Sequence, residues 1–174
     1  IPVISALDGQ LITDKLMMRP KVENKLIVSD TKEDMLKMVV INRYSPAPVA
    51  KAFVKNFGMK KGAIASSVAH DSHNIIAVGV TDDDMVKAVN AVISERGGVS
   101  CVMDNDLKVL PLPVAGLMSN QDGYRVAELY TAIDAMAKDT GSTLSAPFMT
   151  LSFMALLVIP HTKLSDKGLF DGDD

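Results

Sequence analysis

Residues 75–98 read IIAVGVTDDDMVKAVNAVISERGG, and this stretch decides the class of fold. It opens with an apolar run that predicts a buried strand. Thr81 and Asp84 then stand in the spacing of a capping box, and three consecutive aspartates suit the positive end of a helix dipole. Apolar residues recur three and four positions apart from Met85 to Ile93, which predicts one apolar helix face. The glycine pair at 97–98 ends the predicted helix, and the strand–helix order favours an α/β layer arrangement.

The rest of the chain predicts more strands and two more helices. The β-branched run at 38–41 is typical of a strand that is covered on both faces. Further strands are expected over 26–28, 35–43, 49–57, 63–67 and 75–80, and a hairpin over 99–103 and 107–112. Helices are expected over 123–138 and over 147–157, the second short and buried. With no internal repeat or linker, we predict a single domain of the α/β (or α+β) class over 1–174, a mixed β-sheet with packed helices.

The composition is globular and argues against several classes of function. Apolar residues make up 48% of the chain and charged residues 22%, which suffices for a core without disulfides. The net charge of -3, without a run of lysines or arginines, argues against a nucleic-acid partner. No signal peptide or membrane-spanning stretch is recognisable, so no membrane partner is expected. Because the chain starts at Ile1 and not at methionine, we expect a processed product or a fragment of a longer polypeptide.

The densest polar cluster is SSVAHDSHN, residues 66–74, between two predicted strands. Loops at such positions commonly carry function on a rigid scaffold. The candidate site residues are therefore Ser67, His70, Asp71, His73 and Asn74. The two imidazoles titrate near neutral pH, which suits proton transfer, and the carboxylate and the amide could orient a ring or a substrate. The alternative interpretation is that these polar groups only satisfy the backbone of a tight loop.

Other chemistry-bearing residues point to less specific roles. A metal hydrolase built on His70, Asp71 and His73 would need a further ligand. The aspartates at 82–84 could supply one, although starting the helix is their expected role. Cys101 is expected to be a buried small hydrophobe in a reducing compartment, with a catalytic thiol as the alternative. His161 is expected at the surface. Dinucleotide, P-loop, serine-hydrolase and zinc-deaminase motifs are absent from the sequence.

Four ordered segments carry a family resemblance that spans residues from about 35 to 171. They are KGAIASSVAHDSHNIIAVG at 61–79, LPLPVAGLMS at 110–119, PFMTLSF at 147–153 and KLSDKGLF at 163–170. Together they resemble the C-terminal domain of adenine deaminases, and the match departs from the usual pattern near 161–162. The resemblance implies that 1–174 is part of an amidohydrolase-superfamily enzyme that converts adenine and water to hypoxanthine and ammonia.

In that family the active site lies in a (β/α)-barrel with a two-metal centre of manganese or iron, whose ligands include an H-x-H pair. This chain has only His70, His73 and His161, with no H-x-H, so the resemblance places no metal ligand in it and implies that the chain alone is inactive. The expected partners are adenine, the barrel of the same polypeptide and further copies in a homo-oligomer, in cytoplasmic purine metabolism. We expect the loop to complete or support the active site of the barrel. A stand-alone purine-binding or oligomerisation module is the alternative.

Overall fold

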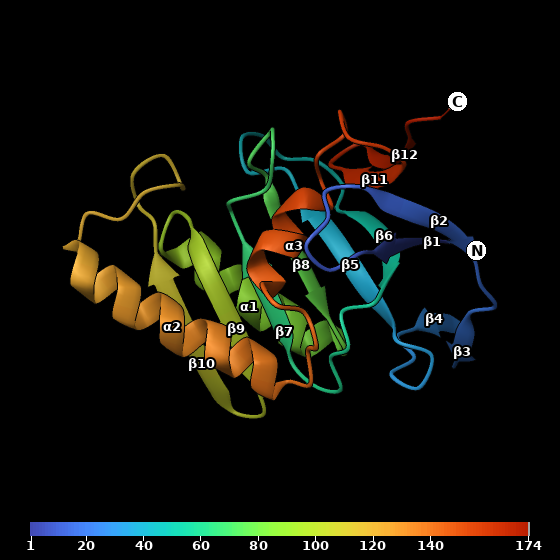
Figure 1. Ribbon diagram of the computed structural model, residues 1–174, viewed down its shortest axis with the longest axis horizontal. Coiled ribbons are helices and arrows are strands. Elements are labelled where there is room, and N and C mark those ends of the chain that lie inside the picture. The colour runs from blue at the N-terminus through green and yellow to red at the C-terminus, as the bar shows by residue number, and fades with distance from the viewer. Residues whose placement is uncertain (174) are drawn as a thin grey trace.

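A sheet of eight strands forms the centre of the computed structural model, which describes residues 1–173 (Figure 1). The strands lie in the order β10-β9-β7-β8-β5-β6-β1-β2, and all neighbours are antiparallel except the parallel pair β1 and β6. This confirms the predicted mixed sheet. The strands are β1 (Pro2–Ala6), β2 (Thr13–Met17), β5 (Met35–Ile41), β6 (Ala50–Lys55), β7 (Ala63–Ser66), β8 (Ile75–Gly79), β9 (Gly98–Met103) and β10 (Asp106–Pro111).

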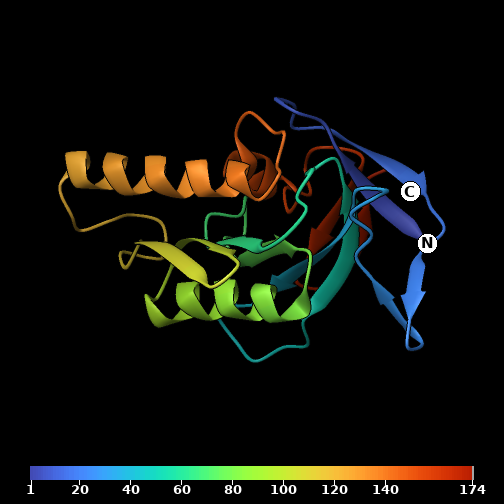
Figure 2. The ribbon, with the colours of Figure 1, turned by 90° about the horizontal axis from the view of Figure 1, so that it is seen from below.

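Helices cover both faces of the sheet, which gives three layers (Figure 2). Helix α1 (Asp82–Ser94) lies on one face, and α2 (Gly123–Asp139) with α3 (Pro147–Phe153) lies on the other. Two short hairpins complete the described fold, β3 (Lys21–Glu23) with β4 (Leu26–Val28), and β11 (Thr162–Ser165) with β12 (Gly168–Asp171).

The core divides into two clusters because successive side chains of a strand point to opposite faces. In β7, Ile64 belongs to the cluster under α2 and α3, whereas Ala63 and Ala65 pack under α1. Strand β5 contributes to both clusters, which confirms the prediction of a strand covered on both faces. Its fully buried Met38 shows the role of many of the methionines, which is to fill the core.

Helix α1 forms as the sequence predicts. The Thr81 hydroxyl accepts a hydrogen bond from the Asp84 backbone N–H at 3.2 Å, and the aspartates occupy the first turn. One residue of the predicted apolar stripe is an exception, because Ile93 lies 51% exposed near the end of the helix. The predicted hairpin over 99–112 is also confirmed, with β10 at an edge of the sheet and ending at Pro111.

Three expectations need correction. The predicted helix over 147–157 ends at Phe153, because the chain then turns so that the Met154 carbonyl accepts a hydrogen bond from Leu164 in β11 at 3.0 Å. Strands β1, β2 and β3 and the hairpin β11–β12 were not expected from the sequence. Strand β5 ends at Ile41, two residues earlier than predicted, where the chain turns toward the candidate loop.

Among residues 1–173, no helix combines the length and the apolar character that crossing a membrane requires.

Candidate functional site

The candidate loop, Ser67–Asn74, lies at one end of the sheet, where several strands end or begin. It connects β7 to β8, and the end of β5 is the register partner of the start of β8, since Ile41 lies opposite Ile75. Figure 1 shows this loop as the green segment beyond the ends of the strands, near α3. The sheet therefore gathers the loop, the segment after β5 and the segment after β10 at one end.

Two of the five candidate residues anchor the loop and do not face solvent. Ser67 is fully buried; its hydroxyl donates to the Gly116 carbonyl at 2.6 Å and accepts from the Gly98 N–H at 2.9 Å. Asn74 is 2% exposed; its amide oxygen accepts from the Arg43 N–H at 3.2 Å, and its amide nitrogen donates to Ser72. For these two residues the structure favours the interpretation that polar groups satisfy a tight loop.

The two histidines lie together and are partly accessible. The His70 and His73 rings meet edge to face with centroids 5.3 Å apart. His70 also stacks on Phe153 of α3, with centroids 5.2 Å apart and planes 27° apart, and its backbone N–H donates to the Ser152 carbonyl at 3.1 Å. Three rings from two elements thus form one aromatic cluster, which we call the ring cluster. Asp71 lies next to it in the chain and is exposed.

The environment of His73 favours the neutral imidazole. Burial lowers its pKa below the usual 6.5, and the neighbouring His70 and the Arg43 cation lower it further. Its Nδ1 atom is buried and has no hydrogen-bond partner among residues 1–173. A neutral imidazole carries one donor and one acceptor nitrogen, so the tautomer decides which of them Nδ1 is.

Arg43 belongs to this site, although the sequence did not single it out. Its Nε donates to the His73 carbonyl at 2.5 Å, and its Nη2 donates to the Ala115 carbonyl at 2.7 Å. The guanidinium also lies 4.8 Å from the centre of the Tyr44 ring, whose hydroxyl donates to the Ser72 carbonyl at 2.7 Å. Arg43 therefore joins the candidate loop to the segment after β10. The only sequence feature at this position is that a cation follows a buried strand.

A glycine makes the approach of Arg43 possible. Gly116 has φ +75°, and a Cβ atom at this position would lie 2.4 Å from Arg43 Nη1. A side chain here would push the guanidinium away from the carbonyls that it binds. The LPLPVAGLMS segment at 110–119 therefore belongs physically to the same site as the histidine loop.

A cavity of about 100 Å³ lies beside the ring cluster. Phe153, which stacks on His70, is also one of its walls. The other walls come from the turn between β1 and β2 and from the start of α3, namely Gly9, Gln10, Leu11, Ser145, Ala146, Met149 and Thr150. This volume is smaller than that of pockets for drug-sized ligands, which measure roughly 300 Å³ or more.

The remaining candidates have structural roles. Among residues 1–173, no group of three or more His, Cys, Asp or Glu side chains is placed to hold a metal ion, so the histidines at 70 and 73 gain no third ligand. Asp84 caps α1 with Thr81, and Asp82 binds Lys37 at 2.7 Å, which explains two of the three aspartates. His161 lies far from the candidate loop in the sequence, and its side chain is 44% exposed and pairs with Asp173 at 2.5 Å.

Cys101 is fully buried in β9, as expected for a small hydrophobe. Burial raises the pKa of its thiol to about 12. A thiol with this pKa is protonated at neutral pH and is a poor nucleophile. The structure therefore disfavours the catalytic-thiol alternative.

The fold and the site define an α/β domain that presents a histidine loop at one end of its sheet and holds no metal-binding cluster within its described part. Comparison with known proteins identifies the family. The profile of the family described as "Adenine deaminase C-terminal domain" matches residues 10–174. The chain therefore belongs to the adenine deaminase C-terminal domain family.

Curated relatives agree with this assignment. The chain is similar to adenine deaminases of Methanosarcina barkeri and of Sulfurovum sp., each 56% identical over 171 residues, and of Borreliella burgdorferi, 45% identical over 175 residues. These matches cover 98–99% of this chain but only 31–32% of each relative. The chain thus spans about a third of the length of the relatives that it matches.

Proposed function

We propose that this chain is the C-terminal part of an adenine deaminase, which hydrolyses adenine to hypoxanthine and ammonia, and that its loop Ser67–Asn74 completes or supports the active site of the preceding barrel. Family membership supports the reaction. The ring cluster supports the role of the loop, because it brings aromatic surface and imidazole nitrogens together at the end of the sheet where the loop lies.

The chemistry that this chain can contribute is positioning and exclusion of water. His70 and Phe153 form a stacked aromatic wall against which a planar base could lie, and imidazole nitrogens could bond to its polar edge. The buried hydrogen bond of Ser67 and the partly buried hydrogen bond of Arg43 hold the loop in place, and holding reactants in position is worth a large part of a rate acceleration. We derive no proton transfer within this chain.

The metal belongs to the proposed barrel. By the resemblance, a pair of manganese or iron ions would supply the nucleophile for the reaction. The residues of this chain do not fit such a centre, since the described part offers no cluster of ligands. For this reason the chain alone should not deaminate adenine. We place the whole enzyme, by the same resemblance, in cytoplasmic purine breakdown as a homo-oligomer.

The test uses a chimaeric polypeptide in which this chain replaces the matching third of the Methanosarcina barkeri relative. His70→Ala and His73→Ala should each lower kcat for adenine deamination about tenfold or more, because the reacting base loses part of its positioning contacts. Metal content, measured by elemental analysis, should stay the same because the ligands lie elsewhere.

His161→Ala is the matched control, since His161 is also a partly exposed histidine but does not belong to the ring cluster. It should leave kcat unchanged. Loop variants with the kinetics of the unchanged chimaera would refute the role of the loop. A chimaera that is inactive with manganese or iron would count against the proposed reaction. Tight binding of adenine by this chain alone would favour the purine-binding module.

A further inference from the structure

The hairpin β3–β4 stands apart from the core and exposes apolar side chains. Val22 and Ile27 are cross-strand partners, 58% and 36% exposed, and Leu26 is 66% exposed. The strands have three residues each, and no residue of the hairpin is buried. A two-stranded hairpin is marginally stable in water by itself. Figures 1 and 2 show it at the edge of the molecule, near the N-terminus.

The neighbouring edge strand adds to this exposed surface. Strand β2 is the last strand of the sheet order, and its Leu16 and Met17 are 36% and 73% exposed. Within the described chain this edge is covered at Thr13, which exchanges backbone hydrogen bonds with Pro160 and His161 at 3.1 Å, and at Lys15, which pairs with Asp171 of β12. An open edge with apolar side chains invites another chain to pack on it or pair with it. We call Leu16, Met17, Val22, Leu26 and Ile27 the edge surface.

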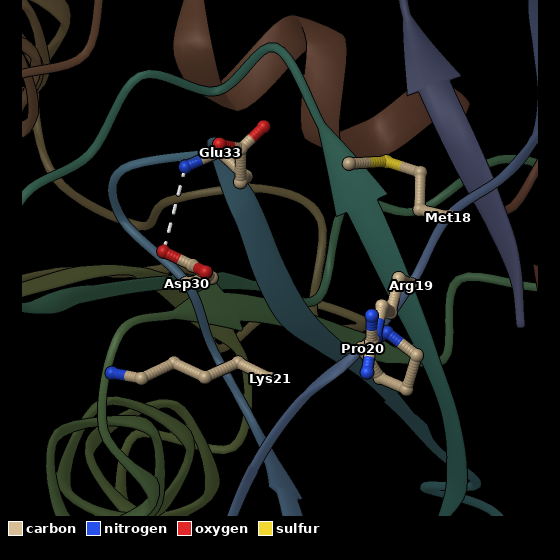
Figure 3. A pocket seen from close by; sticks show the side chains of 6 residues that line it. All are labelled: Met18, Arg19, Pro20, Lys21, Asp30 and Glu33. Carbon is tan, nitrogen blue, oxygen red and sulfur yellow. Dashed lines mark hydrogen bonds between the residues drawn. The ribbon is translucent and has the colours of Figure 1, made fainter.

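A cleft of about 400 Å³ adjoins the edge surface (Figure 3). It lies between the connection from β2 to β3 and the turn after β4, in which the Glu33 N–H donates to Asp30 at 3.4 Å. Its lining combines two apolar side chains, two cations and two carboxylates, from Met18, Arg19, Pro20, Lys21, Asp30 and Glu33. A cleft of mixed charge beside an apolar surface resembles the rim and centre of a protein interface, not a pocket for one ligand.

We propose that the edge surface and this cleft dock the polypeptide that precedes the matched part in relatives of full length. In those relatives about two thirds of the chain lies outside the match, and the matched family is a C-terminal domain. That segment would join this one at Ile1, whose amino group donates to the Met18 carbonyl at 2.8 Å, between the edge strand and the hairpin. The preceding segment would therefore enter the domain beside the exposed edge surface. The inference rests on the proposed function in one respect only, which is that such a preceding segment exists.

Cysteine labelling in the chimaera described above tests the proposal without any need for activity. Val22→Cys is compared with Val86→Cys on α1, because the two valines are equally exposed in this chain, 58% and 57%. The native Cys101 is buried and does not compete for the reagent. If the edge surface is covered, a maleimide should label position 22 at least about tenfold more slowly than position 86, and both equally fast in urea.

Equal labelling of the two positions in the folded chimaera would overturn the proposal. Protection of position 22 that disappears on dilution would also overturn it, because the cover would then be a second copy. A second measurement needs no substitution at the surface: mass spectrometry should find lysine cross-links from Lys21 and Lys25 to the preceding segment. Cross-links only to another copy of this chain would contradict the proposal.

Discussion

At the scale of single residues, His73 combines constraints that the sequence does not reveal. Its backbone adopts φ +52°, which is uncommon for a residue with a side chain, and its carbonyl accepts from Arg43. The polar cluster at 66–74 could be predicted because its composition differs from the strands around it. The different roles of its residues could not be predicted, because Ser67 and Asn74 are held inward by hydrogen bonds to residues about 30 or more positions away in the sequence.

The lowered pKa of His73 predicts a measurable pH dependence of stability. The unfolded chain binds a proton at the usual pKa of 6.5, whereas the folded chain binds it only at lower pH. The free energy of unfolding should therefore fall as the pH drops below about 6.5. His73→Gln removes this titration, so its urea-unfolding free energy should fall less between pH 7.5 and 5.5. An equal fall in both proteins would show that the His73 pKa is not lowered.

At the scale of elements, prediction succeeded where the information is local. Helix α1 follows from its cap and its apolar periodicity, and α2 follows from its apolar periodicity. The hairpin β9–β10 follows from two apolar runs around a polar turn. Strand β2 escaped prediction because four of its five residues are exposed, which leaves no alternating pattern. Its assignment depends on pairing with β1, not on its own composition.

The turn between α1 and β9 contains a packing constraint that leads to a prediction. Gly97 has φ +131°, and a Cβ there would lie 2.3 Å from the Gly116 Cα atom. Gly97→Ala should therefore lower the free energy of unfolding by about 2 kcal/mol or more, through backbone strain and the separation of two backbones. Gly123→Ala at the start of α2 is the control, since a Cβ there meets nothing within 4 Å. Similar stability of both variants in urea unfolding would contradict the close approach.

At the scale of the whole molecule, the two ends of the chain hold each other. The Thr13 hydroxyl donates to the Thr162 carbonyl at 2.8 Å, and Lys163 donates to the Leu11 carbonyl at 2.6 Å. These contacts join residues about 150 positions apart. Separations of this size explain why β11 and β12 could not be found by local pattern. They also place a fully buried lysine where the two ends meet.

Lys163 makes this junction sensitive to alkaline pH. Burial lowers its pKa from the usual 10.5 to about 8. Between these two values the unfolded chain keeps a proton that the folded chain has released, so the stability contributed by Lys163 rises with pH. Each pH unit across this window contributes about 1.4 kcal/mol. The Lys163→Met variant does not titrate in this range. It also removes a buried charge, and it loses the hydrogen bond to the Leu11 carbonyl.

Relative to the Met variant, the parent chain should therefore gain about 2 kcal/mol in unfolding free energy between pH 7 and pH 9.5. Urea unfolding at the two pH values measures this gain directly. Lys167→Met in the exposed turn between β11 and β12 corrects for the general effect of removing a lysine, because Lys167 is exposed. A parent-to-variant difference that is the same at both pH values would mean that the ammonium at the junction keeps its ordinary pKa. The two ends would then be held together by a lysine that stays charged throughout this range.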